Sequence, residues 1–505
     1  MESLFEIPIA IAASRDRSAP QTHELYRQLR EAIADGRLAN DMKLPPTREA
    51  KALFGVSRNT LAAAYERLIS EGYAVGRHGS GTYVVGSARN GAPAAQDAHA
   101  ADASSRLNPF WLSESAHAMN FWRDALQASG SVASRPTVDM RPGLVDLGLF
   151  PFDVFRRVAA KQLRTMEKVT PATSSPQGNR GNFHLREAIT AHVALTRGVS
   201  CHRDDVLVTS GAQQAFDLIA RVLVRPGETK VAVEDPGYPP MRVAFAAAGA
   251  KLVGVPVDAQ GLVVDALPRD ASVICLCPSH QFPLGVTMTP ARRRQLVEFA
   301  RANGATIVED DYDGEFRHEG SPVEPLRTPA NSEHVIYVGT FSKCMFPGLR
   351  LGYLIAAPWA SGALVAAKNC MDWHCSTPLQ TMVAEFISGG HLRRHVRRMR
   401  AAYQRRQRFL LDALAESWGG LLAPVESQYG MHLCAQAADA LDVEALAYTL
   451  RTEGIQLHTL DRYWLGAPAL RGLVFGYGSA GVPQIRKTLA ALRRAVSVSM
   501  RAGLR

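Results

Sequence analysis

The first part of the chain carries apolar residues at helical spacing. Segment 22–36 repeats an apolar side chain every four positions, which predicts an amphipathic helix. Two shorter helices are predicted at 48–54 and 58–71, separated by the turn Gly55-Val56-Ser57, in which Ser57 is a candidate N-cap. A helix, a turn containing glycine and a second helix make a helix-turn-helix.

Two short β-rich runs follow at 73–75 and 82–85, and they flank a glycine-rich basic stretch, 76–81. This pattern predicts a β-hairpin with a basic tip. Residues 1–86 are therefore expected to form a winged helix-turn-helix domain.

From about Arg141 onward, continuous apolar runs alternate with helical stretches. Strands are predicted at 206–209, 230–233, 251–255, 273–276, 306–309, 335–339 and 352–356. Apolar runs without alternation are typical of strands covered on both faces of a mainly parallel sheet. Residues 137–505 are thus predicted to form an α/β domain.

Between the two domains, the sequence from 87 to about 105 consists of Ala, Gly, Ser, Asn, Asp and Pro without periodicity. Such a composition does not bury a core. We predict a linker over 87–136, with aromatic residues in its second half.

The bulk composition is that of a globular chain of two or three domains, 505 residues long. No apolar run is long enough to span a membrane, and segment 1–13 lacks the basic start of a secretory signal. Seven cysteines occur without CxxC spacing, which predicts reduced thiols and no metal site. We expect a cytoplasmic protein with no membrane partner.

The net charge of +10 suggests a polyanionic partner, but the charge is unevenly distributed. Residues 1–86 hold 11 Lys/Arg against 10 Asp/Glu, whereas segment 391–411 has eight arginines and no acid. The arginine-rich segment is either a set of solvated helix faces or a second surface facing a nucleic acid backbone. Net charge alone does not decide between them.

The start of the third helix is predicted to enter the major groove of a double-stranded DNA operator, where Arg can read guanine and Asn adenine. The candidate DNA contacts are Arg58, Asn59, Thr60 and Tyr65 on this helix, Arg48 near phosphates, and Arg77 on the wing. The alternative is a winged helix that makes protein contacts only. The near-neutral domain favours a dimer in which two weak modules cooperate.

Turns after successive predicted strands carry the groups of a pyridoxal 5'-phosphate (PLP) site. Lys343 supplies an amine for a Schiff base, and Asp310 a carboxylate for the pyridine nitrogen. Tyr312 supplies a phenol for the ring oxygen, and Arg350 a guanidinium for the phosphate. Ligands of open α/β sheets bind at these strand ends, so the combination is more specific than any one member.

Other turns complete the predicted site. Free backbone N–H groups where a helix opens after a strand favour a phosphate. The remaining cofactor-binding candidates are Ser210, Gly211 and Ala212 at that helix start, Tyr238 for ring stacking, and the polar His280 and Ser342.

The N-terminal motifs Leu44-Pro45-Pro46-Thr47-Arg48-Glu49 and Gly55-Val56-Ser57-Arg58-Asn59-Thr60 resemble those of GntR-type regulators. Residues from about 137 to 505 resemble fold-type I aminotransferases. The runs 309–316 and 278–285 make the whole chain similar to the MocR subfamily of transcriptional regulators. The resemblance implies a PLP-dependent regulator, usually a head-to-tail homodimer, that responds to an amine, an amino acid or PLP and has little or no transaminase turnover.

One position departs from the aminotransferase pattern. The arginine that binds a substrate carboxylate in a late strand is replaced by Val474, and Arg471 either substitutes for it or is a solvated strand-entry residue. In the favoured hypothesis Lys343 holds PLP as an aldimine that an effector amine displaces. The alternative is an active aminotransferase with an appended DNA-binding or dimerisation module.

Overall fold

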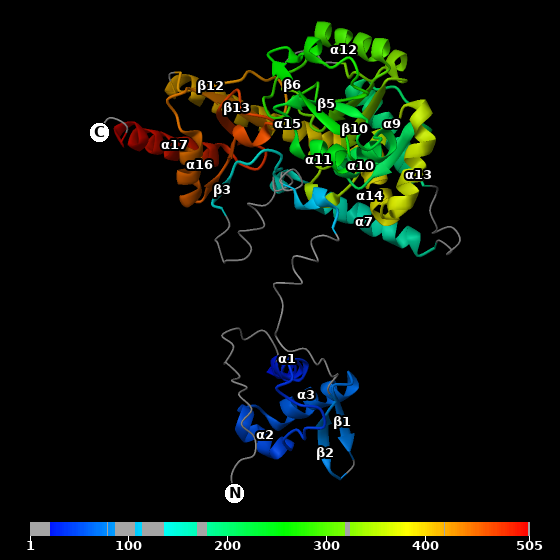
Figure 1. Ribbon diagram of the computed structural model, residues 1–505, viewed down its shortest axis with the longest axis vertical. Helices are drawn as coiled ribbons and strands as arrows, with labels where there is room; N and C mark the ends of the chain where they lie inside the picture. The colour runs from blue at the N-terminus through cyan, green and yellow to red at the C-terminus, as the bar shows by residue number, and fades with distance from the viewer. Residues whose placement is uncertain are drawn as a thin grey trace. The chain divides into compact units, whose positions relative to one another are not determined.

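The computed structural model of the chain describes residues 21–77, 79–85, 107–113, 136–168, 179–318, 324–418 and 420–502 (Figure 1). The chain divides into two compact units, Met1–Arg106 and Leu107–Arg505. This division falls inside the predicted linker, of which only 107–113 and 136 are described, including a 3-10 turn, η1 (Pro109–Leu112). Among the described helices, none has the length and apolar character needed to cross a membrane.

The N-terminal unit has the three predicted helices and the predicted hairpin. Its elements are α1 (Gln21–Ala34), α2 (Thr47–Phe54), α3 (Arg58–Ser70), β1 (Ala74–Arg77) and β2 (Gly81–Val84). The hydroxyl of Ser57 accepts a hydrogen bond from the backbone N–H of Thr60 at 3.1 Å, which caps α3 as predicted.

The core of this unit lies between α1 and α3. Leu25 and Leu29 pack against Leu61 and Leu68, all completely buried. Tyr65 belongs to the same core, and its hydroxyl donates to the backbone carbonyl of Pro45 at 3.0 Å. The prediction that Tyr65 faces DNA is therefore wrong: helical periodicity turns residue 65 inward with positions 61 and 68.

The second unit is built on an eight-stranded sheet in the order β4-β11-β10-β9-β8-β5-β6-β7. The strands are β4 (Val206–Thr209), β5 (Lys230–Asp235), β6 (Lys251–Asp258), β7 (Gly261–Leu262), β8 (Val273–Leu276), β9 (Thr306–Asp311), β10 (Val335–Thr340) and β11 (Gly352–Ile355). Strands β11 and β7 run antiparallel to their neighbours, and the others are parallel. The seven predicted strands are confirmed within a few residues at their ends.

Helices cover both faces of this sheet (Figure 1). Val231 and Val233 pack toward α10 (Ala212–Leu223), α11 (Pro239–Ala247) and α13 (Ser361–Asp372). Ala232, between them, packs with α12 (Pro290–Asn303) on the other face. Two-sided burial explains why these strands read as unbroken apolar runs.

A second sheet follows late in the chain, in the order β12-β13-β16-β15, and is antiparallel. Its strands are β12 (Leu422–Pro424), β13 (His432–Ala437), β15 (His458–Thr459) and β16 (Gly472–Gly476); β14 (Ile455–Gln456) pairs separately with β3 (Val138–Asp139). The remaining helices are α7 (Phe152–Met166), α9 (Phe183–Arg197), α14 (Thr377–Ser388), α15 (His391–Ser417), α16 (Val443–Thr452) and α17 (Val482–Ala502).

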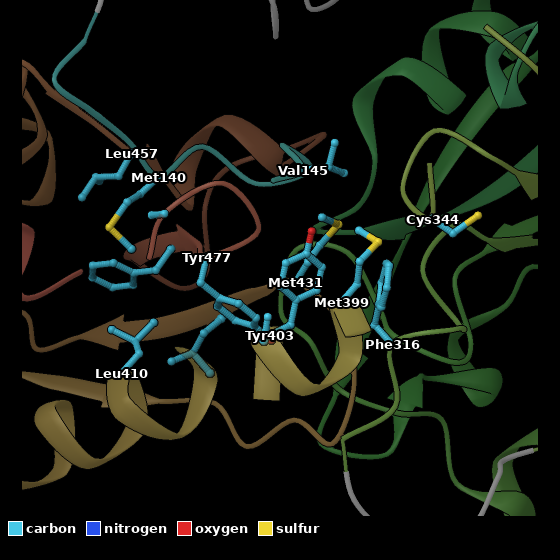
Figure 2. Packing of buried hydrophobic residues seen from close by; sticks show 14 of the residues in the cluster. Met140, Val145, Phe316, Cys344, Met399, Tyr403, Leu410, Met431, Leu457 and Tyr477 are labelled. Atoms are coloured by element: carbon cyan, nitrogen blue, oxygen red, sulfur yellow. The ribbon is translucent and has the colours of Figure 1, made fainter. Parts of the chain in front are cut away.

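One apolar cluster joins the two sheets of this unit. Met399 and Tyr403 of α15 contribute to it, together with Tyr477 after β16, as Figure 2 shows. The rings of Tyr403 and Tyr477 lie 6.4 Å apart. The same cluster includes the buried Cys344, so it anchors the residue next to Lys343.

Candidate functional site

The predicted site residues gather because five parallel strands end at one edge of the large sheet. Strands β4, β10, β9, β8 and β5 share one direction, and each is followed by a turn that carries predicted cofactor residues. The carboxyl edge of a parallel sheet is where α/β proteins bind ligands. The sheet order therefore brings together segments that are far apart in the sequence.

Lys343 lies in the turn after β10. Its Nζ donates to the backbone carbonyl of Gly143 at 2.8 Å. Burial lowers the pKa of the Lys343 amine from its usual 10.5 to about 8, although Asp313 and Asp310 act in the opposite direction. A larger fraction of the amine is consequently neutral, and nucleophilic, near neutral pH.

Gly143 was not predicted as a site residue, because it lies 200 positions before the lysine. Its backbone has φ +85°, and a Cβ there would come within 2.6 Å of the lysine Nζ. A side chain at 143 would displace the lysine amine. Nothing in the local sequence marks this glycine.

Asp310, the penultimate residue of β9, is almost completely buried. The thiol of Cys277 lies 3.7 Å from Oδ2, while Oδ1 has no hydrogen-bond partner among the described residues. Burial, and then the charge of Asp311, raise the pKa of Asp310 to about 8. An unpaired buried carboxylate oxygen is costly unless a donor satisfies it, and a pyridinium N–H is such a donor.

Tyr312 is held by a short polar chain. Its hydroxyl lies 2.9 Å from Nδ1 of His280, and the same nitrogen lies 2.8 Å from Oδ2 of Asp313. Burial lowers the pKa of His280 to about 3, so the ring is neutral. Tyr312 and His280 were predicted from the sequence, but Asp313, which contacts the imidazole beside the phenol, was not.

The predicted phosphate cradle is formed by the start of α10 and by Arg350. Gly211 is the N-cap residue of α10, with φ +85°, and no side chain caps the helix. Arg350 donates to the backbone carbonyl of Ser210 at 3.1 Å, and a Cβ on Gly211 would lie 3.5 Å from the guanidinium. The start of α10 and the exposed guanidinium of Arg350 are therefore neighbours, and free backbone N–H groups beside a guanidinium fit a phosphate.

Ser342 is placed by a hydrogen bond from the Thr340 hydroxyl at 3.0 Å. Ser210 lies 3.4 Å from the sulfur of Cys375, whose other neighbour is the buried Lys368. Lys368 and Cys375 were not predicted as site residues. Lys368 lies in α13 and Cys375 in the turn after it, and both are distant in sequence from every motif.

Tyr238 is the N-cap residue of α11, and its ring meets Phe282 edge-on at 5.4 Å. It packs in an apolar cluster that also contains Tyr312 and Val474. Stacking of Tyr238 on a cofactor ring stays a prediction.

Val474, at the expected carboxylate-binding position, is completely buried in that same cluster. Arg471, in contrast, is exposed at the entry to β16. Burial raises the pKa of Asp461, and the charge of Arg471 opposes that rise. The position expected to bind a substrate carboxylate is therefore occupied by a buried apolar residue, Val474. A role for Arg471 toward an effector carboxylate stays a prediction without a described contact to the site.

Candidate metal ligands also meet at this edge: one atom each of His280, Asp313 and His432 lies within 4.8 Å of the others. Nδ1 of His280 already faces Asp313 and Tyr312, and Nε2 of His432 lies 3.1 Å from the Pro283 carbonyl. These contacts account for His280 and Asp313 as groups that orient Tyr312, so we do not assign a metal here.

In the N-terminal unit the predicted DNA contacts lie on the surface. Arg58 and Asn59 are exposed at the start of α3, and Arg48 is exposed on α2. Thr60 is half-buried, and its hydroxyl lies 2.8 Å from that of Ser57.

Arg77, at the end of β1, pairs with Asp41 at 2.6 Å and lies 4.4 Å from the centre of the Tyr83 ring. Both partners of this pair are exposed, and such surface pairs exchange readily for other anions. Arg77 is therefore able to contact a phosphate.

Comparison with known proteins agrees with the division of the chain into two units. The family model for aminotransferase class I and II matches residues 146–463, and the model for bacterial regulatory proteins of the gntR family matches residues 21–84. The chain is 32% identical over 486 residues to the probable rhizopine catabolism regulatory protein MocR of Rhizobium meliloti, covering 96% of this chain and 95% of that protein. It is 31% identical over 498 residues to the pyridoxine biosynthesis transcriptional regulator PdxR of Corynebacterium glutamicum, covering 98% and 100%.

Among solved structures, kynurenine aminotransferase of Pyrococcus horikoshii, crystallised with PMP, superimposes with a TM-score of 0.68 at 25% identity. The match covers 81% of this chain and 100% of that one. Relatives over nearly the full length are named as transcriptional regulators, and the fold of the second unit is that of an aminotransferase. The chain belongs to the MocR-type regulators of the GntR family, transcriptional regulators in which a GntR helix-turn-helix is joined to an aminotransferase class I and II domain.

Proposed function

We propose that this regulator binds PLP at the carboxyl edge of its large sheet and adjusts operator binding in response to PLP or to a small amine or amino acid that reacts with it. The observation that carries the proposal is the buried Oδ1 of Asp310, unpaired among the described residues, in a site that also contains an amine of lowered pKa. Burial raises the pKa of Asp310 to about 8 and thus favours its neutral form near pH 7, and a cationic or N–H partner at the unpaired oxygen would stabilise the ionised form. The name of the relative PdxR, a regulator of pyridoxine biosynthesis, supports the same class of signal.

Each residue has a distinct task. Asp310 accepts the ring N–H and, by its charge, keeps that nitrogen protonated. Tyr312, oriented through His280, donates to the ring oxygen. Arg350 and the start of α10 hold the phosphate.

When bound, PLP supplies an aldehyde that condenses reversibly with primary amines. Lys343 is the amine that the fold presents, and its lowered pKa keeps part of it neutral. An effector amine competes with the Lys343 amine for the same aldehyde. The carbonyl of Gly143, which accepts from Nζ of Lys343, would hold the lysine side chain whenever Lys343 does not engage the aldehyde.

Transmission to DNA requires that the effector bind two arrangements of the protein with different affinity. We propose a head-to-tail homodimer in the cytoplasm, with winged helices over 1–86, linkers over 87–136 and effector domains over 137–505. Two weak DNA-binding units held by one dimer would then bind two half-sites of the operator. The effector would change the distance between the two DNA-binding units.

A second candidate is an active aminotransferase, because Lys343, Asp310 and Tyr312 are the groups that a catalyst also needs. The apolar Val474 argues against it, since amino acid substrates carry a carboxylate that must be paired. Arg471 is exposed at the entry to β16 and has no described contact to the site residues.

The test is DNA protection on the protein's own upstream region, with and without PLP and with a panel of amines. A protection pattern that changes with PLP or with one amine is expected. The same panel is assayed for keto acid. Steady keto acid production would favour the aminotransferase, and protection that is indifferent to PLP and to every amine would contradict the sensing proposal.

A further inference from the structure

A cavity lined by arginines lies near the end of β9, on the face of that strand opposite to the side chain of Asp310. Its volume is about 400 Å³, and its lining includes Arg317, Arg393, Arg397 and Arg400. Asp310 and Asp311 are consecutive in β9, so their side chains leave opposite faces. Asp311 pairs with Arg197, a further lining residue, at 2.5 Å.

The positive charge of this cavity is only partly compensated by the residues that the structure describes. Three described carboxylates lie near it: Asp311 is paired with Arg197, Glu315 lies 3.4 Å from His192, and the buried Asp313 faces His280. Arg393 and Arg397 are exposed and form no ion pair with any described residue, and the same holds for the half-buried Arg317. Five arginines of the lining thus stand against three described carboxylates.

Arg400 forms the floor of the cavity. Its guanidinium donates to the backbone carbonyl of Glu315 at 2.6 Å and stays half-buried. Burial, and then the charge of Arg317, lower the pKa of Arg400. Like charges held together in a partly buried place repel each other, and an anion would relieve that repulsion.

The residues that line the cavity narrow the class of anion. Arg393, Arg397 and Arg400 follow one face of α15 at helical spacing, and Thr196 of α9 is also part of the lining. The carboxyl end of α9 contributes about half a negative charge, which the arginines exceed. Converging guanidinium groups match the several oxygens of a phosphate bidentately.

We propose that this cavity binds a phosphate-bearing small molecule, at a site separate from the cofactor site. The arginine-rich segment of α15 then has a specific ligand, rather than serving only as a solvated face. The cavity shares no residue with the predicted phosphate cradle at Arg350 and α10.

The experiment titrates pyrophosphate into the full-length protein at constant ionic strength and follows binding by calorimetry. We expect saturable binding that is weakened at least tenfold in the double variant Arg393→Gln/Arg397→Gln. The matched control is Arg294→Gln/Arg405→Gln, which removes the same charge from two exposed arginines outside the cavity. This control is expected to bind as the parent chain does.

Two further measurements distinguish this cavity from the cofactor cradle and from a DNA-binding surface. Arg350→Gln should leave unchanged the component of pyrophosphate binding that depends on Arg393 and Arg397; loss of that component in this variant would place the anion in the cofactor cradle and overturn the proposal. Equal weakening in both double variants would indicate general charge attraction and would also overturn it. The proposal also fails if pyrophosphate does not saturate the protein while a duplex without operator sequence binds through Arg393 and Arg397, since the surface would then contact a DNA backbone.

Discussion

The two units place their functional side chains in opposite surroundings. In the winged helix, Arg58 and Asn59 are neighbours in sequence and exposed at the start of one helix. In the aminotransferase-like unit, Asp310 lies in β9 and Lys343 in the turn after β10, and burial changes the pKa of both. A surface that reads DNA needs only a rigid local scaffold, whereas a site that captures an aldehyde needs a protein interior to alter its groups.

The largest effect is expected from substitution of Lys343, which tests the role of the buried site in contrast to the exposed DNA-binding surface. In Lys343→Ala we expect complete loss of the visible absorption that develops when the protein is mixed with PLP, because the amine is removed. Lys251→Ala, which removes an exposed lysine, should keep it. If Lys343→Ala lost the colour but kept effector-dependent DNA binding, the sensing mechanism would be wrong.

The double variant Arg58→Ala/Asn59→Ala tests the exposed unit. Each contact to a base edge contributes about 1–3 kcal/mol, so we expect operator affinity to fall at least tenfold at fixed salt. Fluorescence anisotropy with the protected fragment measures it, and Glu66→Ala, exposed further along α3, is the control. PLP absorption should not change, since neither residue belongs to the cofactor site. Unchanged operator affinity would move the recognition surface away from the start of α3.

Asp310→Asn removes the charge but keeps the shape of the side chain. A hydrogen bond to a charged group contributes about 2 kcal/mol, so PLP affinity should fall roughly thirtyfold. The variant is compared with Asp270→Asn, a change to an exposed carboxylate paired with Lys230. Equal PLP affinity in Asp310→Asn and the parent would exclude Asp310 as the partner of the ring nitrogen.

The pH dependence of PLP attachment reports the pKa of Lys343. Because the neutral amine reacts and its pKa is lowered to about 8, the rate should rise as pH increases and level off above that value. Between about pH 7 and pH 9.5 the neutral fraction, and hence the rate, increases roughly tenfold. Stopped-flow absorption measures the rate. An amine of ordinary pKa would instead give a rate that still rises steeply at about pH 9.5.

The smallest effect is expected at Tyr65. Its substitution tests whether this residue of α3 belongs to the core or contacts DNA. Tyr65→Phe removes the hydrogen bond to the Pro45 carbonyl and should lower the free energy of unfolding of the winged helix by about 1 kcal/mol. Urea denaturation measures the loss, and operator selectivity should not change. A change in selectivity without a loss of stability would return Tyr65 to the DNA-facing surface.

Much of the fold could be predicted because its signals are local. The strand at 306–309 could be predicted from its apolar residues Ile307 and Val308, whereas its extension to Asp311 through acidic residues could not. Ser57 could be predicted as the N-cap of α3 because a hydroxyl residue directly before a helix accepts a hydrogen bond from its first turn. Tyr65 was misplaced because an aromatic side chain on an amphipathic helix fits either face until the partner helix is known. Of the second sheet only the late strand around Val474, which is β16, was predicted, because β15, for example, has only two residues and carries no periodic signal.

The sequence by itself determined which groups are available: an amine, a carboxylate, a phenol and a guanidinium after successive strands, and a basic helix start in the first unit. These follow from residue type and spacing, which are properties of short segments. Only the tertiary structure decided how the groups behave. The contact of Lys343 with Gly143, the chain from Asp313 through His280 to Tyr312, and the surroundings of the Asp310 carboxylate depend on segments that only packing brings together. Because pKa and hydrogen bonding depend on burial and on near neighbours, they are set by the fold rather than by the motif.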